Sequence, residues 1–390
     1  MKRFDRGYFD QEFQRKGTDC RKWDDAGACP GDCVPLWVAD MDFACAPAIV
    51  EAVRKRAEHP CYGYNADDIK GTEALCAYWQ RRHQVTFAPE NTASLPCVVT
   101  GLRIAVQAFT KEDEPVAIFS PVYGPFAASI KVNGRRVAAV PLSQDADGRY
   151  YMNLPGLEDA FKDGARLLML CNPHNPVSRP WSWEELESLC QLAKKYNVTI
   201  VSDEIHADFV YRPGSFVSLL SLPAARERTI MFCAATKTFN LAGLQQASAV
   251  SYSKDLLDRF NEKCNAAGVT SGNSFAIAAM RAAYTDCDEW LDGLIEYLDG
   301  NRAAVMEFAA QYLPKAKVTP IEATYLAWVD LSAYGKTCDE MGELFRKSGV
   351  SLTGGTFFGA EGEGFMRINF ACPRKQLEEG IRRMGKALEE

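Results

Sequence analysis

Lys237 is the residue of this sequence that most clearly offers chemistry. It follows the apolar run Thr229–Cys233 and precedes Gly243, so its amine would stand at the end of a buried strand. An ammonium group there is costly unless it is paired or chemically used, and desolvation makes a lysine amine nucleophilic. Lys237 is therefore a candidate for a Schiff base with an aldehyde cofactor. A solvated loop lysine is the alternative, which this motif alone does not exclude.

A carboxylate closes another apolar run. Asp203 ends Val198–Asp203, and His206 follows shortly after it. A carboxylate at the edge of a core must be paired with a cation or well hydrogen-bonded, and a protonated pyridine nitrogen is such a cation. Helix capping by Asp203 is the alternative reading.

Two proline-containing loops offer further polar groups. The rigid loop Asn172–Pro176 fixes Asn175 as a hydrogen-bond donor, and Tyr123 lies between Pro121 and Pro125. The ring of Tyr123 could lie flat against a cofactor, or it could be a surface tyrosine in a turn.

Gly101 and Leu102 follow the expected strand Pro96–Thr100. A glycine that opens a helix offers free backbone N–H groups to a phosphate, although an ordinary strand-to-helix turn explains this motif equally well. In Phe365–Phe370, alternation places Arg367 and Asn369 on one face of a strand. Arg367 would there bind an anion, or else be a surface arginine on an edge strand.

Asn175, Asp203 and Lys237 terminate apolar strands. Such strands alternate with amphipathic helices, which indicates an α/β fold with a mostly parallel sheet. Ser182 to Glu185 is a capping-box start for a helix that continues to about Tyr196. After about Thr285 the pattern changes to long helices and two strands, which suggests a smaller α+β domain. The expected strands of the sheet are Pro96–Thr100, Val116–Phe119, Arg136–Val140, Arg166–Cys171, Val198–Asp203, Thr229–Cys233 and Ala247–Ser251.

Composition excludes several classes of function. The chain has 390 residues and a net charge of −7, with no basic face to neutralise nucleic acid. No apolar run approaches a membrane span, and the first residues lack the apolar core of a signal peptide. We therefore expect a soluble, cytoplasmic protein with neither nucleic acid nor membrane as a partner.

The 14 cysteines contain no pair of CxxC motifs, and there are only 4 histidines. We therefore expect no metal site. Cys29 and Cys33, with Cys20 upstream, are the nearest approach to a cluster. We interpret them as reduced thiols, and a metal site or a disulfide is the less favoured alternative.

Six segments, in this order, resemble pyridoxal-phosphate (PLP) enzymes of fold type I, the aspartate aminotransferase superfamily. Within it, the chain is most similar to cystathionine β-lyases (C–S lyases) of the MalY/PatB type. The resemblance implies a seven-stranded, mostly parallel sheet in a large domain (residues 45–285) and a small α+β domain (1–44 with 286–390). The segments are Leu36–Phe43, Tyr62–Tyr64, Asn172–Pro176, Ser202–His206, Thr236–Gly243 and Gly364–Asn369.

The resemblance also implies roles for the cofactor. Lys237 would form the Schiff base with PLP and move the Cα proton of the substrate, while Asp203 would pair with the pyridine nitrogen. The remaining implied contacts are Asn175 with the phenolic oxygen, His206 close by, Tyr123 stacked on the ring, and the amides of Gly101 and Leu102 with Thr236 around the phosphate.

For the substrate and the assembly, the resemblance implies three further roles. Arg367 would bind the α-carboxylate of the amino acid, with the backbone of Ala39 nearby. Tyr64 would reach the phosphate of the neighbouring subunit's cofactor, which makes the protein a homodimer with shared active sites.

Three positions depart from the common pattern of the superfamily. Gln245 stands where many aminotransferases have a phosphate-binding arginine, a loss shared with many C–S lyases. Ser178 replaces a glycine, so a left-handed backbone there would cost free energy. Gly124 replaces a larger residue, which predicts a wider substrate pocket.

The expected reaction is α,β-elimination from L-cystathionine or a related cysteine S-conjugate, giving pyruvate, ammonia and a thiol. Transamination between an amino acid and a 2-oxo acid shares the first steps, and residue types separate the two poorly. A regulator that acts by protein binding, as MalY-like proteins do, is a third reading, against which the complete set of catalytic residues argues.

Overall fold

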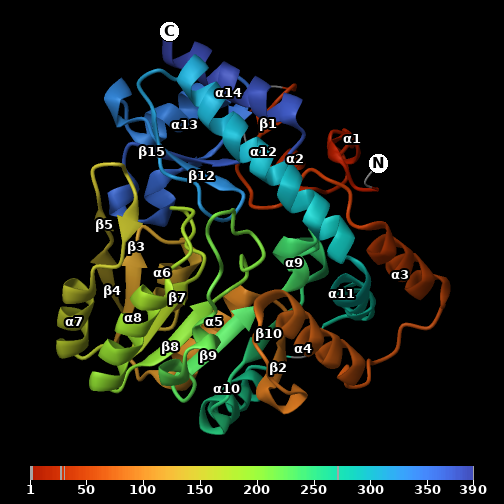
Figure 1. Ribbon diagram of the computed structural model, residues 1–390, viewed down its shortest axis with the longest axis vertical. Helices are drawn as coiled ribbons and strands as arrows, with labels where there is room; N and C mark the ends of the chain where they lie inside the picture. The colour runs from red at the N-terminus through yellow and green to blue at the C-terminus, as the bar shows by residue number, and fades with distance from the viewer. Residues whose placement is uncertain (1–2, 27–28, 30, 270–271, 390) are drawn as a thin grey trace.

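The computed structural model describes residues 3–26, 29, 31–269 and 272–389, and its centre is a seven-stranded sheet (Figure 1). Strand β10 runs antiparallel to both of its neighbours, and the other strands share one direction. The predicted mostly parallel α/β sheet is confirmed. In spatial order the strands are β2 (Thr92–Leu95), β10 (Ala247–Val250), β9 (Thr229–Cys233), β8 (Thr199–Asp203), β7 (Leu167–Cys171), β3 (Pro115–Ser120) and β4 (Arg136–Pro141).

The central strands are continuous apolar runs because helices cover both faces of this sheet. Ile118 and Met169 point to the side of α5, α6 and α10, whereas Phe119 and Leu168 point to the side of α7 and α8. Helix α8 starts with the predicted capping box, in which the Ser182 hydroxyl accepts from the Glu185 amide at 3.3 Å. Among the described residues, no helix is both long and apolar enough to cross a membrane. The helices around the large sheet are α3 (Pro47–Glu58), α4 (Ile69–His83), α5 (Val98–Phe109), α6 (Pro125–Val132), α7 (Leu154–Lys162), α8 (Trp183–Lys195), α9 (Ala235–Thr238), α10 (Lys254–Ala266) and α11 (Ser274–Asp286).

A second, four-stranded sheet lies at the C-terminal end, shown in blue at the top of Figure 1. The N-terminal segment pairs with this part of the chain in a separate two-stranded sheet, formed by β1 (Val34–Pro35) and β13 (Val350–Ser351). The two sheets fall on either side of the predicted domain boundary near residue 285, which stays a prediction. The elements of this part are α1 (Arg6–Phe9), α2 (Arg21–Asp24), α12 (Asp288–Tyr312), β11 (Lys317–Val318), β12 (Leu326–Asp330), α13 (Cys338–Lys347), β14 (Thr353–Gly354), β15 (Phe365–Asn369) and α14 (Arg374–Glu389), and a further hairpin consists of β5 (Ser143–Gln144) and β6 (Tyr150–Tyr151).

The predicted strand Pro96–Thr100 is wrong. The strand is β2, which ends at Leu95, and Val98 already begins helix α5. Proline ends the ladder because it has no N–H group to donate. Val98 and Val99 have strand propensity, but both lie in the first turn of α5, where Val98 is buried in the core, so tertiary packing overrides propensity here.

The structure also contradicts the expectation of reduced thiols at Cys29 and Cys33, which form a disulfide. Their Cα atoms are 5.7 Å apart, within the distance that a disulfide can bridge. Cys20 stays a free thiol. The spacing of the cysteines left this pairing open, because connectivity depends on how the chain folds back on itself.

Candidate active site

A cavity of about 160 Å³ opens at the carboxyl ends of β7, β8 and β9. This is where ligands bind in open α/β sheets, because the loops that leave neighbouring parallel strands meet there. The cavity is lined by Ala39, Cys97, Val98, Val99, Tyr123, Cys171, Asn175, Asp203, Ile205, His206, Thr236, Lys237 and Ala242.

Lys237 lies on α9, a single turn directly after β9, so the end of the strand fixes its position. Its Nζ donates to the carbonyl oxygen of Ala39 at 2.5 Å. Burial lowers the pKa of Lys237 to about 8, Asp40 and Asp203 oppose this shift, and Arg367 adds to it. Near neutral pH a useful fraction of this amine is therefore unprotonated, as a nucleophile or general base requires.

Asp203 is the last residue of β8 and is 5% exposed. Its Oδ1 accepts from the Ile205 amide at 3.2 Å, and within the described residues no cation lies at ion-pair distance from it. Burial raises the pKa of Asp203 to about 7. The carboxyl group thus lacks the cation that its burial demands, and a protonated ring nitrogen in the cavity would supply it.

Arg367 lies on β15, which has β12 on one side and β14 on the other, so the edge-strand alternative is excluded. The side chain is 3% exposed, and its Nη2 donates to the Trp37 carbonyl at 2.6 Å. Its Nε has no partner, and burial lowers the pKa of Arg367 to about 10. No carboxylate of the described residues forms an ion pair with it, so the guanidinium is free to receive an anion.

Asn175 joins two other predicted residues. Its Oδ1 accepts from Arg367 Nη1 at 3.2 Å, and its carbonyl accepts from the Tyr123 amide at 3.0 Å. With Oδ1 engaged, the Nδ2 group is the part of the amide that can donate into the cavity, as predicted.

His206 is buried, and its Nδ1 has no partner. Burial lowers its pKa to about 3, so the imidazole is neutral. Sequence reasoning missed its neighbour Tyr325, whose ring centroid lies 5.6 Å away and whose hydroxyl donates to the Ala39 carbonyl at 3.1 Å. No local motif marks Tyr325, because its relation to the cavity depends on how the two sheets pack.

Gly101 and Leu102 do not line the cavity. The Gly101 amide donates to the Cys97 carbonyl at 3.2 Å, so it is not free, and the prediction that Gly101 opens the helix is wrong. Because α5 begins three residues earlier, Val98 and Val99 present the unbonded amides of its first turn, and both line the cavity. The glycine serves close packing instead, since a Cβ there would lie 2.8 Å from Leu95 Cδ1.

Thr236 and Tyr123 line the cavity as predicted, but Tyr64 does not. Its side chain is fully exposed on the extended segment that joins α3 to α4. The predicted contact of Tyr64 with a neighbouring subunit stays a prediction.

The space beside Gly124 is filled by Phe357, so the expectation of a wider pocket at this position is wrong. A Cβ on Gly124 would lie 2.6 Å from the Phe357 carbonyl oxygen, and the rings of Tyr123 and Phe357 have centroids 6.2 Å apart. The absence of a side chain at position 124 lets the turn Gly355–Phe358 approach the loop after β3.

Ser178 has a φ of 56°, the left-handed conformation that was expected to cost free energy. Its hydroxyl offsets this cost by donating to the Leu326 carbonyl, and it also contacts Thr324 Oγ1 at 3.2 Å. Thr324 is left-handed as well, with a φ of 60°. Two strained residues therefore support each other between the loop after β7 and the strand β12.

For this pair we expect Ser178→Ala to lower the free energy of unfolding by about 1–3 kcal/mol, because the buried Leu326 carbonyl is left with the longer bond from Thr324 Oγ1, at 3.4 Å, and the strain remains. Ser178→Gly loses the same bond but relieves about 1–2 kcal/mol of strain, so it should be close to neutral. Urea unfolding of both variants measures the difference. Equal destabilisation by alanine and glycine would contradict this account.

These features define a class of protein, namely an α/β protein with a buried lysine, carboxylate and arginine around one cavity at the carboxyl edge of its sheet. The family model for aminotransferases of class I and II matches residues 31–384. The chain is 40% identical to cystathionine β-lyase PatB of Bacillus subtilis over 385 residues, which cover 97% of this chain and 99% of PatB. The chain belongs to the class I and II aminotransferase family.

Solved structures show the same similarity. Cystalysin from Treponema denticola, which contains pyridoxal 5′-phosphate, is 30% identical with a TM-score of 0.94 and 98% coverage of both chains. The PLP-bound C–S lyase from Staphylococcus hominis is 30% identical with a TM-score of 0.91, again with 98% coverage of both chains.

Proposed function

We propose that this protein is a PLP-dependent C–S β-lyase that cleaves L-cystathionine or a related cysteine S-conjugate to pyruvate, ammonia and a thiol. The observation that carries the proposal is the buried carboxyl of Asp203, which lacks a cation in a cavity that also holds the desolvated amine of Lys237. The similarity to lyases over nearly the full chain supports elimination as the reaction.

The residues present fit the cofactor. Asp203 would hold the proton on its ring nitrogen, Lys237 would bind its aldehyde carbon, and Asn175 would donate to its phenolic oxygen. The free amides of the first turn of α5 and the hydroxyl of Thr236 would bind its phosphate. When bound, PLP supplies an electron sink for the carbanion formed at the substrate Cα.

The protein's own side chains would then perform the proton chemistry. Arg367 would bind the α-carboxylate and so orient the Cα–H bond toward Lys237. The amine of Lys237 would remove the Cα proton, which its lowered pKa permits. Loss of the thiolate from Cβ would follow, and Lys237 would return the proton taken from Cα to the leaving sulfur. Hydrolysis of the released enamine by water would then give pyruvate and ammonia.

The function is tested by pyruvate release from L-cystathionine with the purified holoenzyme, with and without an added 2-oxo acid. Pyruvate formed without the acceptor is the expected result. Amino transfer to the acceptor with no pyruvate would assign the protein to the aminotransferases instead, and absence of both reactions would overturn an enzymatic role.

For Arg367→Lys we expect kcat/KM for L-cystathionine to fall by roughly 10–100-fold, mainly through KM. Lysine keeps the charge but loses the paired N–H groups that grip a carboxylate, worth about 1.5–3 kcal/mol. Arg382→Lys is the control, since the Arg382 side chain is 48% exposed and pairs with Glu379. An unchanged KM in Arg367→Lys would remove the arginine from substrate binding.

We also propose that the protein is a homodimer. The support is Tyr64, which is fully exposed and does not line the cavity of its own chain. Sedimentation velocity of the holoenzyme tests the assembly. A cytoplasmic location is also proposed, supported by the twelve cysteines that are free thiols.

A further inference from the structure

The carbonyl of Ala39 is the only hydrogen-bond acceptor that the described residues present to the amine of Lys237. It accepts from Lys237 Nζ at 2.5 Å and from the Tyr325 hydroxyl at 3.1 Å. Ala39 belongs to segment 37–43, which lies between the cavity and the four-stranded sheet and contains neither helix nor strand. The Asp42 amide donates to the Ala371 carbonyl at 2.9 Å, and side chains supply the other bonds that tie this segment to its neighbours among the described residues.

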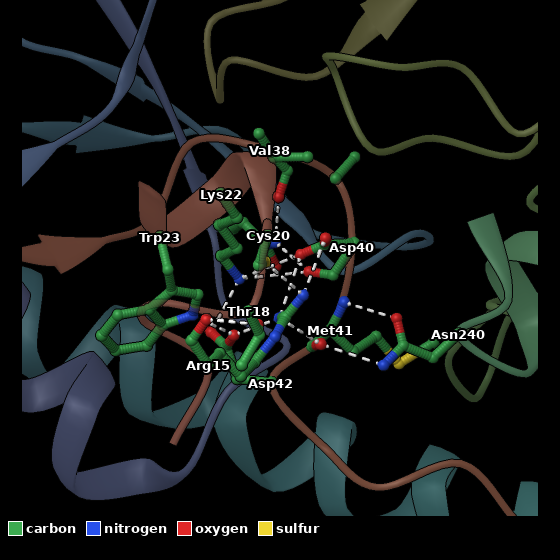
Figure 2. A network of polar contacts seen from close by, with 12 residues as sticks. Arg15, Thr18, Cys20, Lys22, Trp23, Val38, Asp40, Met41, Asp42 and Asn240 are labelled. Carbon is green, nitrogen blue, oxygen red and sulfur yellow. Dashed lines mark hydrogen bonds and ion pairs between the residues drawn. The ribbon is translucent and has the colours of Figure 1, made fainter. Parts of the chain in front are cut away.

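Four buried or half-buried charges form a cluster, in which Arg15 and Lys22 meet Asp40 and Asp42 of this segment (Figure 2). Lys22 is fully buried, and its Nζ donates to Asp42 Oδ2 at 2.7 Å and to the Asp40 carbonyl at 3.2 Å. Arg15 binds Asp42 Oδ1 at 2.5 Å, Asp40 Oδ2 at 3.1 Å and the Met41 carbonyl at 2.8 Å. Two cations from the N-terminal segment thus hold the two carboxylates and two carbonyls of the three residues that directly follow Ala39.

Two asparagines hold the segment from its other sides. Asn369 of β15 donates to the carbonyls of Val38 and Asp40, each at 2.6 Å. Asn240, three residues after Lys237, accepts from the Met41 amide at 3.0 Å and donates to the Met41 carbonyl at 2.9 Å, as Figure 2 shows. The segment that contacts the lysine is thereby tied to the turn that carries the lysine.

Stability alone does not explain this cluster. Removing charges from water costs several kcal/mol per ion, and well-packed apolar residues of similar volume are often as stable as a buried ion pair. An ion cluster differs from an apolar core in fixing directions, because each donor must meet its acceptor. The groups fixed here belong to Asp40, Met41 and Asp42, which directly follow Ala39 in the chain.

We propose that the charge cluster Arg15–Lys22–Asp40–Asp42 is a positioning device for Lys237, which holds the Ala39 carbonyl as the acceptor of the free lysine amine. This rests on the proposed function, in which Lys237 must act as a base once it is no longer bonded to the cofactor. A hydrogen bond to Ala39 uses one N–H of the amine and leaves its lone pair free to accept a proton.

The cluster also sets the charge around Lys237. Asp40 raises the pKa of Lys237, so Asp40→Asn should lower it and move the acid limb of the kcat profile to lower pH. Lys22→Met removes a cation that compensates Asp40 and Asp42, so it should move that limb to higher pH. Lys237 faces the charged or titratable groups of Asp40, Asp203, His206, Tyr325 and Arg367.

If the substitutions only loosened segment 37–43, a different change in the pKa of Lys237 would be expected. Water reaching Lys237 would relieve its desolvation and raise its pKa in both variants. The opposite signs expected for Asp40→Asn and Lys22→Met therefore separate positioning by the cluster from a merely structural role.

The test uses the holoenzyme of both variants, with Arg383→Met as the matched control. Arg383 also ties the N-terminal segment to the C-terminal part, through Asp32 at 2.9 Å, but its contacts do not include residues 37–43. One readout is the kcat profile against pH. The other is hydrogen exchange of a peptide that covers residues 37–43, which does not depend on the reaction catalysed.

We expect exchange of this peptide to accelerate roughly tenfold or more in Lys22→Met, equivalent to about 1.4 kcal/mol, and to stay unchanged in Arg383→Met. The acid limb of kcat should move in opposite directions in Lys22→Met and Asp40→Asn. Shifts of the same sign, or unchanged exchange in Lys22→Met, would overturn the proposal. Failure of the parent enzyme to release pyruvate would overturn the proposed function and leave the exchange result valid.

Discussion

Lys237→Ala should reduce pyruvate release from L-cystathionine by about 10⁴-fold. A positioned base contributes about 10²–10⁴-fold, and the covalent bond to the cofactor is lost in addition. Lys237 lines the same cavity as Asp203 and Asn175. The substitution therefore removes the amine that would reach the substrate Cα. Single-turnover measurement with L-cystathionine gives the rate of the chemical step.

Lys254→Ala is the control for this variant. The Lys254 side chain is 85% exposed and pairs with Asp258 on the surface of α10, so activity should stay within twofold of the parent. Substantial pyruvate release by Lys237→Ala, at more than about one-tenth of the parent rate, would contradict the role of Lys237 as base.

Asp203→Asn should lower kcat by roughly 10²–10³-fold. The carboxylate is the group in the cavity that can hold a proton on the ring nitrogen, and loss of a preorganised electrostatic partner costs about 2.7–4 kcal/mol in the transition state. Asparagine keeps the volume and can still accept from the Ile205 amide, so the fold is retained.

Although Asp203→Asn should lower kcat, we expect it to raise the stability of the protein without cofactor at high pH. Burial raises the pKa of Asp203 from 3.8 to about 7, so the folded chain binds this proton more tightly than the unfolded chain. The contribution of Asp203 to stability is therefore present below pH 3.8 and is lost as pH rises through about 7. At pH 8 we expect Asp203→Asn without cofactor to be more stable than the parent by roughly 1–4 kcal/mol.

Glu204→Gln is the matched control for both effects. Glu204 is the next residue, its pKa is also raised to about 7 by burial, and it does not line the cavity. It should show the same change of stability with pH, measured by urea unfolding at pH 5 and pH 8, but retain pyruvate release. Loss of activity in Glu204→Gln equal to that in Asp203→Asn would show that burial of a carboxyl, and not its place beside the cofactor, explains the effect.

The cavity could be predicted from the sequence because parallel strands place their carboxyl ends at one edge of the sheet. Asn175, Asp203 and Lys237 each follow an apolar run, and this was enough to bring them together. The start of helix α5 is harder to predict from the sequence. Pro96 to Thr100 has the β-branched residues of a strand but folds largely as the first turn of α5. Gly101 was therefore assigned amides that belong to Val98 and Val99.

The order of residues is enough to predict which chemical groups this protein has and which sheet edge they share, because periodicity and strand ends are local properties of the chain. The tertiary structure alone decided that the Ala39 carbonyl receives Lys237, across 198 residues of sequence, and that Arg367 bonds Asn175 across 192. It also decided that Phe357 fills the space at Gly124 and that Cys29 pairs with Cys33. Such contacts depend on how distant segments pack against each other, and no local pattern of residues encodes that packing.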